Sequence, residues 1–370
     1  MIRAPASLRR SPSSQANTLS FKCQKRSIGV DKVIQFTLKS RYYFTRLSDF
    51  EKKIYREIYD CWVTGSSVAK ITFPGTSFTL PSGMELHKLV TYIIDENPHL
   101  FHLETSQFHY SRIGSQVSIQ ADHVYSRDEY KRIYAKLTAR VEQIVHKAKH
   151  YRTDYEKLRY LHDYLAENIS YDTGLPDPRS QREVHTIVGA LLNSACVCDG
   201  YARAYRLLCD QLHLSCIVAI GNSTAMDNNG PHAWNFVKLN NRVYHVDVTW
   251  DSCLISSNCP VTDYYFLRND AVFSKEHSWD SSLYPPIIED YPRKEPMIFN
   301  KIGLEQYICE KVKTGGRDLL FQLPDNFPGG ETLQQRIKEI VARNAFVFRK
   351  IKSYSTSYYN NIKYAQIHFE

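Results

Sequence analysis

Several features that would place a chain in a particular class are missing from this sequence of 370 residues. It has no apolar run close to the roughly 20 residues that span a bilayer, so we expect no membrane helix. None of its 9 cysteines forms the C-x-x-C pair of a zinc site, so we expect no bound metal. The number of cysteines is odd, and the sequence lacks the apolar h-region of a secretory signal peptide. Both features favour reduced thiols over a disulfide framework.

Acidic residues are absent before Asp31, whereas lysines and arginines are frequent there. This segment supplies most of the formal net charge of +8, and the rest of the chain is close to balanced. Because the sequence shows no basic stripe on a folded face, we expect no nucleic-acid partner. We predict a basic disordered arm at residues 1–40 of a cytoplasmic protein. The same composition would also suit an organellar leader or a start codon placed too far upstream.

Helical capping signals organise residues 41–150. Ser48, Ser82 and Ser126 are each followed three residues later by a glutamate, which is the pattern of a capping box at a helix start. A strand-like alternation around residues 106–121 separates the second helix from the third. We therefore predict an N-terminal module of helices and strands at residues 41–150.

The far end of the chain has a different pattern. Residues 291–370 contain one helical repeat of apolar positions and two strand-like runs on either side of Asn360-Asn361. We predict a C-terminal α/β appendage over this range. The remaining segment, residues 151–290, contains the residues that indicate chemistry.

A cysteine at a predicted helix start is the first of these residues. In the stretch GALLNSACVCDGYARAYRLLC, apolar positions recur at helical spacing after Cys198. A thiol at a helix N-terminus lies beside unpaired backbone N–H groups and the positive end of the helix dipole. Both favour the thiolate, which is the nucleophilic form of cysteine. Cys196, two residues earlier, is an alternative that we interpret as a buried thiol.

A predicted hairpin over residues 232–250 supplies a base and an acid. Asn240-Asn241 suits a two-residue turn, which pairs Leu239 with Arg242 and would place Trp234 opposite Asp247. His232 and Asp247 would then be diagonal neighbours on one face, roughly 7–8 Å apart at the backbone. Cysteine, histidine and aspartate together are the parts of a nucleophilic site in which His232 takes the thiol proton and Asp247 orients the histidine.

The other aromatic and histidine side chains of this hairpin are less informative. Trp234 shares the face of His232 and is a candidate substrate-binding residue, although packing is an equal alternative. Strand parity places Trp250 on the opposite face, where core packing is expected. We interpret His245 as a structural histidine, and we assign no chemistry to His277.

Three segments of this chain resemble one known family. They are V-C-D-G-Y at Val197–Tyr201, H-A-W-N at His232–Asn235 and Y-H-V-D-V-T-W at Tyr244–Trp250. In this order they resemble the bacterial transglutaminase-like domain of the papain-like cysteine peptidase superfamily. The resemblance covers about residues 155–290 and suggests a transglutaminase-like catalytic domain at residues 151–290.

The resemblance implies both a fold and an activity. The fold would be α+β, with a nucleophile helix packed on an antiparallel sheet and mixed α/β modules on either side. Cys198, His232 and Asp247 would be the catalytic triad, and no cofactor would be needed. We predict a thiol-dependent amide-bond hydrolase or acyltransferase that acts on peptides or proteins. The alternatives are a protein-glutamine transamidase and a non-catalytic protein-binding module; the oligomeric state is not predicted.

Overall fold

The computed structural model describes residues 20–21, 41–72, 83–104, 108–172, 174, 178–224, 230–257, 259, 262–292, 295, 297–298 and 300–370. These divide into two compact units, the first within residues 1–35 and 41–131 and the second within residues 36–40 and 132–370. Most of the predicted arm lies outside the described residues. The four-part division of the chain, with boundaries near residues 40, 150 and 290, stays a prediction.

The first unit contains an antiparallel sheet and two main helices, α2 (Asp49–Val63) and α3 (Gly83–Glu96). The sheet order is β1-β2-β4-β3, with β1 at Ser20–Phe21, β2 at Val68–Thr72, β3 at His109–Ile113 and β4 at Gln116–Gln120. Two shorter elements are α1 (Tyr42–Arg46) and the 3-10 turn Pro98–Leu100. One apolar cluster joins α2, α3 and the sheet.

Two of the three predicted capping boxes are present. The Ser48 hydroxyl accepts the Glu51 backbone N–H, and the Glu51 carboxylate accepts the Ser48 N–H, so α2 begins as predicted. Ser126 and Glu129 make the same pair of hydrogen bonds before α4 (Arg127–Ala148). The third signal falls on Ser82, which lies outside the described residues.

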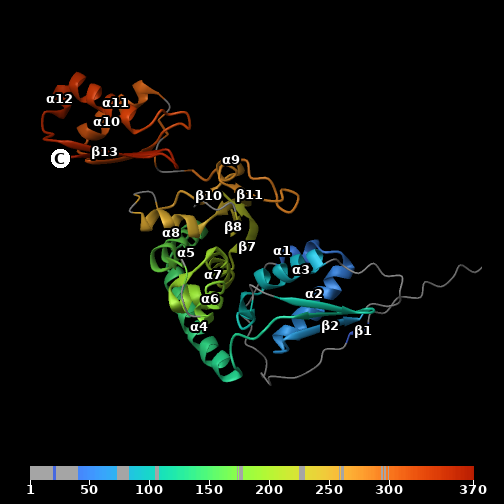
Figure 1. The fold of residues 1–370 in the computed structure, drawn as a ribbon. Coiled ribbons are helices and arrows are strands. Elements are labelled where there is room, and N and C mark those ends of the chain that lie inside the picture. The colour runs from blue at the N-terminus through green and yellow to red at the C-terminus, as the bar shows by residue number, and fades with distance from the viewer. Residues whose placement is uncertain are drawn as a thin grey trace, which may run out of the picture. The chain divides into compact units, whose positions relative to one another are not determined.

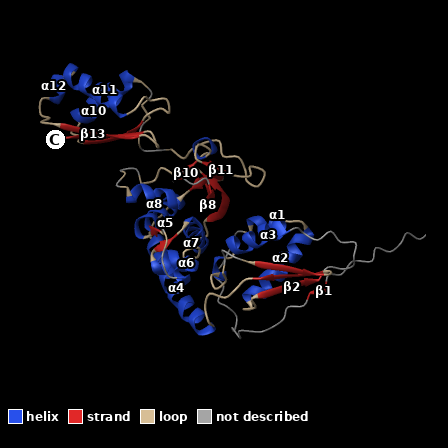
Figure 2. Ribbon diagram, in the orientation of Figure 1, coloured by secondary structure: helices blue, strands red, loops and turns tan. Residues whose placement is uncertain are grey.

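The second unit is built around a five-stranded antiparallel sheet of order β10-β9-β8-β7-β11. Its strands are β7 (Ser215–Ser223), β8 (Gly230–Leu239), β9 (Arg242–Val246), β10 (Phe266–Arg268) and β11 (His277–Ser278). Helix α7 (Cys198–Gln211) packs on β7 and β8, and α5 (Asp154–Asn168) and α8 (Val248–Ser256) pack on α7 (Figure 1). The predicted α+β class, with a helix on an antiparallel sheet, is confirmed (Figure 2).

The approach to α7 is short and tightly packed. A π-helical turn at Gly189–Asn193 ends at Ser194, whose φ is 56°. Strand β6 (Ala195–Cys196) then pairs in parallel with β5 (Ser170–Tyr171). In the first turn of α7, a Cβ on Gly200 would lie 2.5 Å from the carbonyl oxygen of Val184. Glycine at this position therefore lets the helix start close against the preceding chain.

The predicted hairpin has the predicted register but ends earlier than expected. Asn240 and Asn241 have φ values of 51° and 62°, and Leu239 pairs with Arg242. The ladder ends at Asn235 opposite Val246. The prediction that the strand continues to Trp250 is wrong, because the Asp247 side chain accepts the Trp250 N–H and starts helix α8.

The C-terminal part of the second unit contains a three-stranded sheet of order β12-β14-β13. Strands β13 (Tyr354–Tyr359) and β14 (Tyr364–Phe369) lie on either side of Asn360-Asn361, as the sequence predicts. The predicted helix is α11 (Gly330–Arg343). Helices α10 (Lys301–Lys313) and α12 (Ala345–Phe348) and strand β12 (Asp318–Gln322) complete this part. The remaining short helices are α6 (Pro178–Glu183) and α9 (Asp270–Phe273).

Across the described residues, no helix combines the length and the apolar character that crossing a membrane requires.

Candidate active site

Cys198 is the first residue of α7, as the sequence predicts. Its backbone follows the extended N-cap residue Val197, and its side chain is only partly exposed. The side chain packs against an apolar group formed by Ala202, Val218 and Ala233. The thiol therefore lies at a helix N-terminus, next to the strand that carries His232.

His232 connects Cys198 to Asp247. Its Nε2 lies 2.7 Å from Oδ2 of Asp247, and the Cys198 side chain is close enough to the same ring to raise its pKa. Since Nε2 faces the carboxylate, Nδ1 is the nitrogen left for the thiol. Burial opposes protonation of the ring, but the Asp247 charge and hydrogen bond, with a further contribution from Cys198, raise the pKa of His232 to about 10.

Asp247 uses its two carboxylate oxygens for different purposes. Oδ1 accepts the Trp250 N–H at 3.1 Å and caps α8, whereas Oδ2 lies within hydrogen-bond distance of both His232 and His277. The side chain is fully buried. Burial alone would raise the pKa of Asp247, but the charge and hydrogen bonds of the two histidines hold it well below its usual range.

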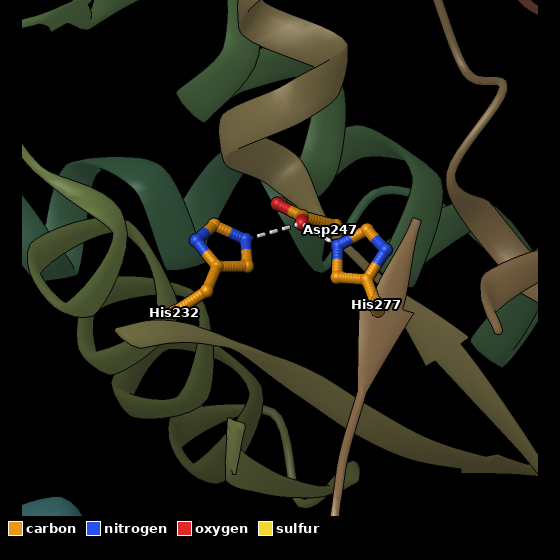
Figure 3. Close-up of side chains that lie close together, drawn as sticks. All are labelled: His232, Asp247 and His277. Atoms are coloured by element: carbon orange, nitrogen blue, oxygen red, sulfur yellow. Dashed lines mark hydrogen bonds and ion pairs between the residues drawn. The ribbon is translucent and has the colours of Figure 1, made fainter. Parts of the chain in front are cut away.

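The structure thus brings Cys198, His232 and Asp247 together, although not by the strand pairing that the sequence suggested. His232 and Asp247 both lie beyond the last paired residues of β8 and β9. Helix α8 turns the Asp247 side chain toward His232, which is how the two side chains meet despite the shorter ladder (Figure 3).

His277 is a close neighbour that sequence reasoning left without a role. Strand β11 pairs with β7, His277 opposite Ser223, and this places Nε2 of His277 3.0 Å from Oδ2 of Asp247. Figure 3 shows the two histidine rings reaching the carboxylate from opposite sides. The resemblance extends through the segment that contains His277, but no spacing rule predicts an antiparallel pairing between strands more than 50 residues apart.

Two tryptophans surround these groups. Trp234 is only 1% exposed, donates its indole N–H to Nδ1 of His245 at 3.0 Å and has its ring 6.0 Å from that of His232. This burial favours packing, and its substrate-binding role stays a prediction. Trp250 lies 6.0 Å from the His232 ring and 4.4 Å from the His277 ring, so the prediction that it faces away is wrong. The parity argument fails because the strand ends at Val246.

The structural interpretation of His245 agrees with its contacts. Its Nε2 lies 2.9 Å from Oδ1 of Asp270, and its Nδ1 accepts the Trp234 N–H. Both ring nitrogens are therefore occupied, and burial lowers the pKa of this histidine.

The neighbouring cysteines differ from Cys198 in their surroundings. Cys196 is fully buried, and burial raises the pKa of its thiol well above the usual value. Cys253 on α8 is partly exposed like Cys198, but burial and the charge of Asp247 raise its pKa to about 11. Of the two partly exposed thiols among the described cysteines, Cys198 is the one that interacts with the His232 ring.

His232, Asp247 and His277 could also be considered as a metal site. One side-chain atom from each lies within 4.8 Å of the others. Structural zinc takes four protein ligands and catalytic zinc takes three, so the number of ligands alone does not decide the matter. Hydrogen bonds of 2.7 and 3.0 Å already account for its geometry. We therefore describe it as a carboxylate shared by two histidines.

A helix that starts at a cysteine packs here on an antiparallel sheet that carries His232, and Asp247 directly follows a strand of the same sheet. Residues 139–248 match the family model of the transglutaminase-like superfamily, and this part of the chain is a transglutaminase-like domain. The resemblance seen in the sequence is confirmed at the level of the superfamily; a bacterial branch is not shown.

Two curated proteins and one solved structure are similar to part of this chain. Over 42% of the present chain, the sequence is 26% identical to the kyphoscoliosis peptidase of Mus musculus. Over 36% of the present chain, it is 28% identical to the kyphoscoliosis peptidase of Homo sapiens. The matches span 27% and 23% of those proteins, about a quarter of their length. A solved structure described as a TGase is 14% identical, with a TM-score of 0.28, over 46% of this chain and 49% of that one.

Proposed function

We propose that residues 151–290 form a catalytic domain that cleaves amide bonds of peptides or proteins through an acyl-enzyme on Cys198. The observation that supports this most strongly is the position of Cys198 at the start of α7 beside His232, whose Nε2 lies 2.7 Å from the buried Asp247. A raised pKa of about 10 keeps His232 protonated beside the thiol at neutral pH. An imidazolium in that position stabilises a thiolate, the form in which cysteine attacks.

The chemistry follows from these positions. The Cys198 thiolate attacks the carbonyl carbon, and His232 gives its proton to the leaving nitrogen as the C–N bond breaks. Water then loses a proton to His232 and attacks the thioester, which releases the acid and restores the Cys198 thiolate beside a protonated His232. The backbone N–H of Cys198, at the N-terminus of α7, is the first donor for the oxyanion because first-turn N–H groups lack partners within the helix.

Hydrolysis is favoured over transfer to an amine. Water is always available, whereas transamidation needs a second site that binds the amine. The two curated relatives are named as peptidases, which supports a peptide or protein substrate. Transamidation uses the same acyl-enzyme, so it remains an outcome of the test rather than a separate mechanism.

A mass-spectrometric assay tests this proposal. The full chain is incubated with an unfolded protein or a glutamine-containing peptide, with and without a primary amine. We expect cleavage or deamidation that falls by about 10³-fold or more in Cys198→Ser. Cys253→Ser, which alters a thiol of similar exposure, should retain the activity. Amine in the product would indicate a transamidase, and no turnover on any substrate would leave the binding-module alternative.

A further inference from the structure

His277 reaches the proposed site from a strand on the opposite side of β7 from His232. Its side chain is fully buried, and its Nε2 lies 3.0 Å from Oδ2 of Asp247. The family resemblance, the shape of the hairpin and the proposed reaction all account for Cys198, His232 and Asp247. None of them requires a second histidine on the same carboxylate oxygen.

The surroundings of His277 indicate which nitrogen carries its hydrogen. Its ring lies 4.4 Å from that of Trp250, 4.5 Å from Phe273 and 5.3 Å from Trp234. Within the described residues, Nδ1 is buried and has no hydrogen-bond partner. A buried N–H without an acceptor is costly, so the hydrogen belongs on Nε2, where it is donated to Asp247.

The two histidines therefore share one acceptor. His232 and His277 both bond to Oδ2 of Asp247, and their rings are 5.3 Å apart. A second donor on this oxygen takes up part of its negative charge. The positive end of the His277 N–H dipole also lies close to the ring that must become an imidazolium. Both effects reduce the stabilisation of protonated His232 by the carboxylate and so lower the pKa of His232.

We propose that His277 is a positioning residue that acts through Asp247: its Nε2–H bond to Oδ2 reduces the charge that the carboxylate presents to His232, so that His232 can release its proton to the leaving group. This role rests on the proposed function, since it matters only if His232 transfers protons. Trp250 holds the other oxygen of Asp247 through its backbone N–H, so the carboxylate stays in place when His277 is replaced.

Other ionisable groups face this cluster from the elements packed around it. Cys198 on α7 interacts electrostatically with His232, and the Tyr265 ring lies 6.0 Å from that of His277 and donates its hydroxyl hydrogen to Glu276. His245 on β9 is occupied by Asp270. These groups are the same in every variant below, so a difference in the titration of His232 reports the change at residue 277.

The test is an NMR titration of His232 in protein labelled at its histidine rings, with the signal assigned by its loss in His232→Ala. His277→Phe keeps an aromatic ring and removes the donor, whereas His277→Gln places an amide N–H near the original Nε2. We expect the midpoint of His232 to rise by about half a unit to one unit in His277→Phe. In His277→Gln it should stay close to the wild-type midpoint, and the signal of the exposed His368 should not move in either variant.

An unchanged or lower midpoint in folded His277→Phe would overturn the proposal, and so would equal shifts in the two variants. If neither variant folds, the wild-type protein still decides the question. Nitrogen chemical shifts should show His277 with its hydrogen on Nε2, and a hydrogen on Nδ1 would contradict the proposal. The NMR signals of His232 and His277 can be measured without turnover. A failed peptide assay would therefore count against the proposed function and not against the proposed effect of His277 on Asp247 and His232.

Discussion

Replacing Asp247 by asparagine is expected to slow alkylation of Cys198 by about a hundredfold near pH 6, where an ordinary thiol is almost entirely protonated. His232 is buried, and without the carboxylate its burial disfavours the charged ring. The thiolate then loses its imidazolium partner. Asparagine is a good N-cap, so helix α8 should still begin at residue 247.

Site-resolved mass spectrometry after iodoacetamide treatment measures this effect. Asp270→Asn is the matched control, because Asp270 holds His245 at 2.9 Å in the same way but has no bond to His232. The control should keep the wild-type rate at Cys198. A folded Asp247→Asn protein that is alkylated as fast as the wild type would show that the carboxylate does not serve the thiol.

The second large effect is expected at His162, which joins α5 to α8. Its Nδ1 lies 2.9 Å from Asp163 and its Nε2 2.9 Å from Asp251, and the ring is fully buried. His162→Phe would leave the buried Asp251 carboxylate without its histidine. We expect a loss of about 3–5 kcal/mol in the free energy of unfolding, as for other broken buried pairs. Hydrogen exchange of α5 and α8 in urea measures it.

The same variant has a pH signature. Burial opposes the charged form of His162, but the two aspartates outweigh it and raise its pKa to about 9. A raised pKa adds stability that is complete below the ordinary histidine value, about 6.5, and is lost as the pH passes through about 9. The wild-type protein should therefore lose about 3 kcal/mol of this contribution over that window, whereas His162→Phe should instead show the titration of Asp251, whose pKa burial raises to about 6. An NMR midpoint near 6.5 for the His162 ring of the wild-type protein would mean that His162 is not held in the charged form. His368→Phe, at an exposed pair with Asp318, should cost no more than about 1 kcal/mol.

Local signals in the sequence predicted those parts of the fold that local chemistry determines. The Ser48 and Ser126 boxes begin helices because a serine, a glutamate and two backbone N–H groups satisfy one another within four residues. The Asn240-Asn241 turn determines the hairpin register because both residues adopt positive φ. Cys198 at the start of α7 belongs to the same group.

The rest of the site depends on competing and long-range interactions. The alternation through Tyr244, Val246 and Val248 predicts a continuing strand, but the Asp247 side chain captures the Trp250 N–H and begins a helix instead. Because the chain becomes helical at this point, the Trp250 ring lies next to the rings of His232 and His277. His277 reaches Asp247 only because β11 joins the far edge of β7, a pairing that no local pattern specifies.

The most direct test of the central claim, that Cys198 is an activated thiol, compares two cysteines in the unmodified protein. Cys198 and Cys253 are both partly exposed, but the pKa of Cys253 is raised to about 11. With limiting iodoacetamide near pH 6, Cys198 should be alkylated at least about tenfold faster than Cys253, and His232→Ala should slow the alkylation of Cys198 while leaving that of Cys253 unchanged. Equal rates at the two cysteines in the wild-type protein would contradict the claim.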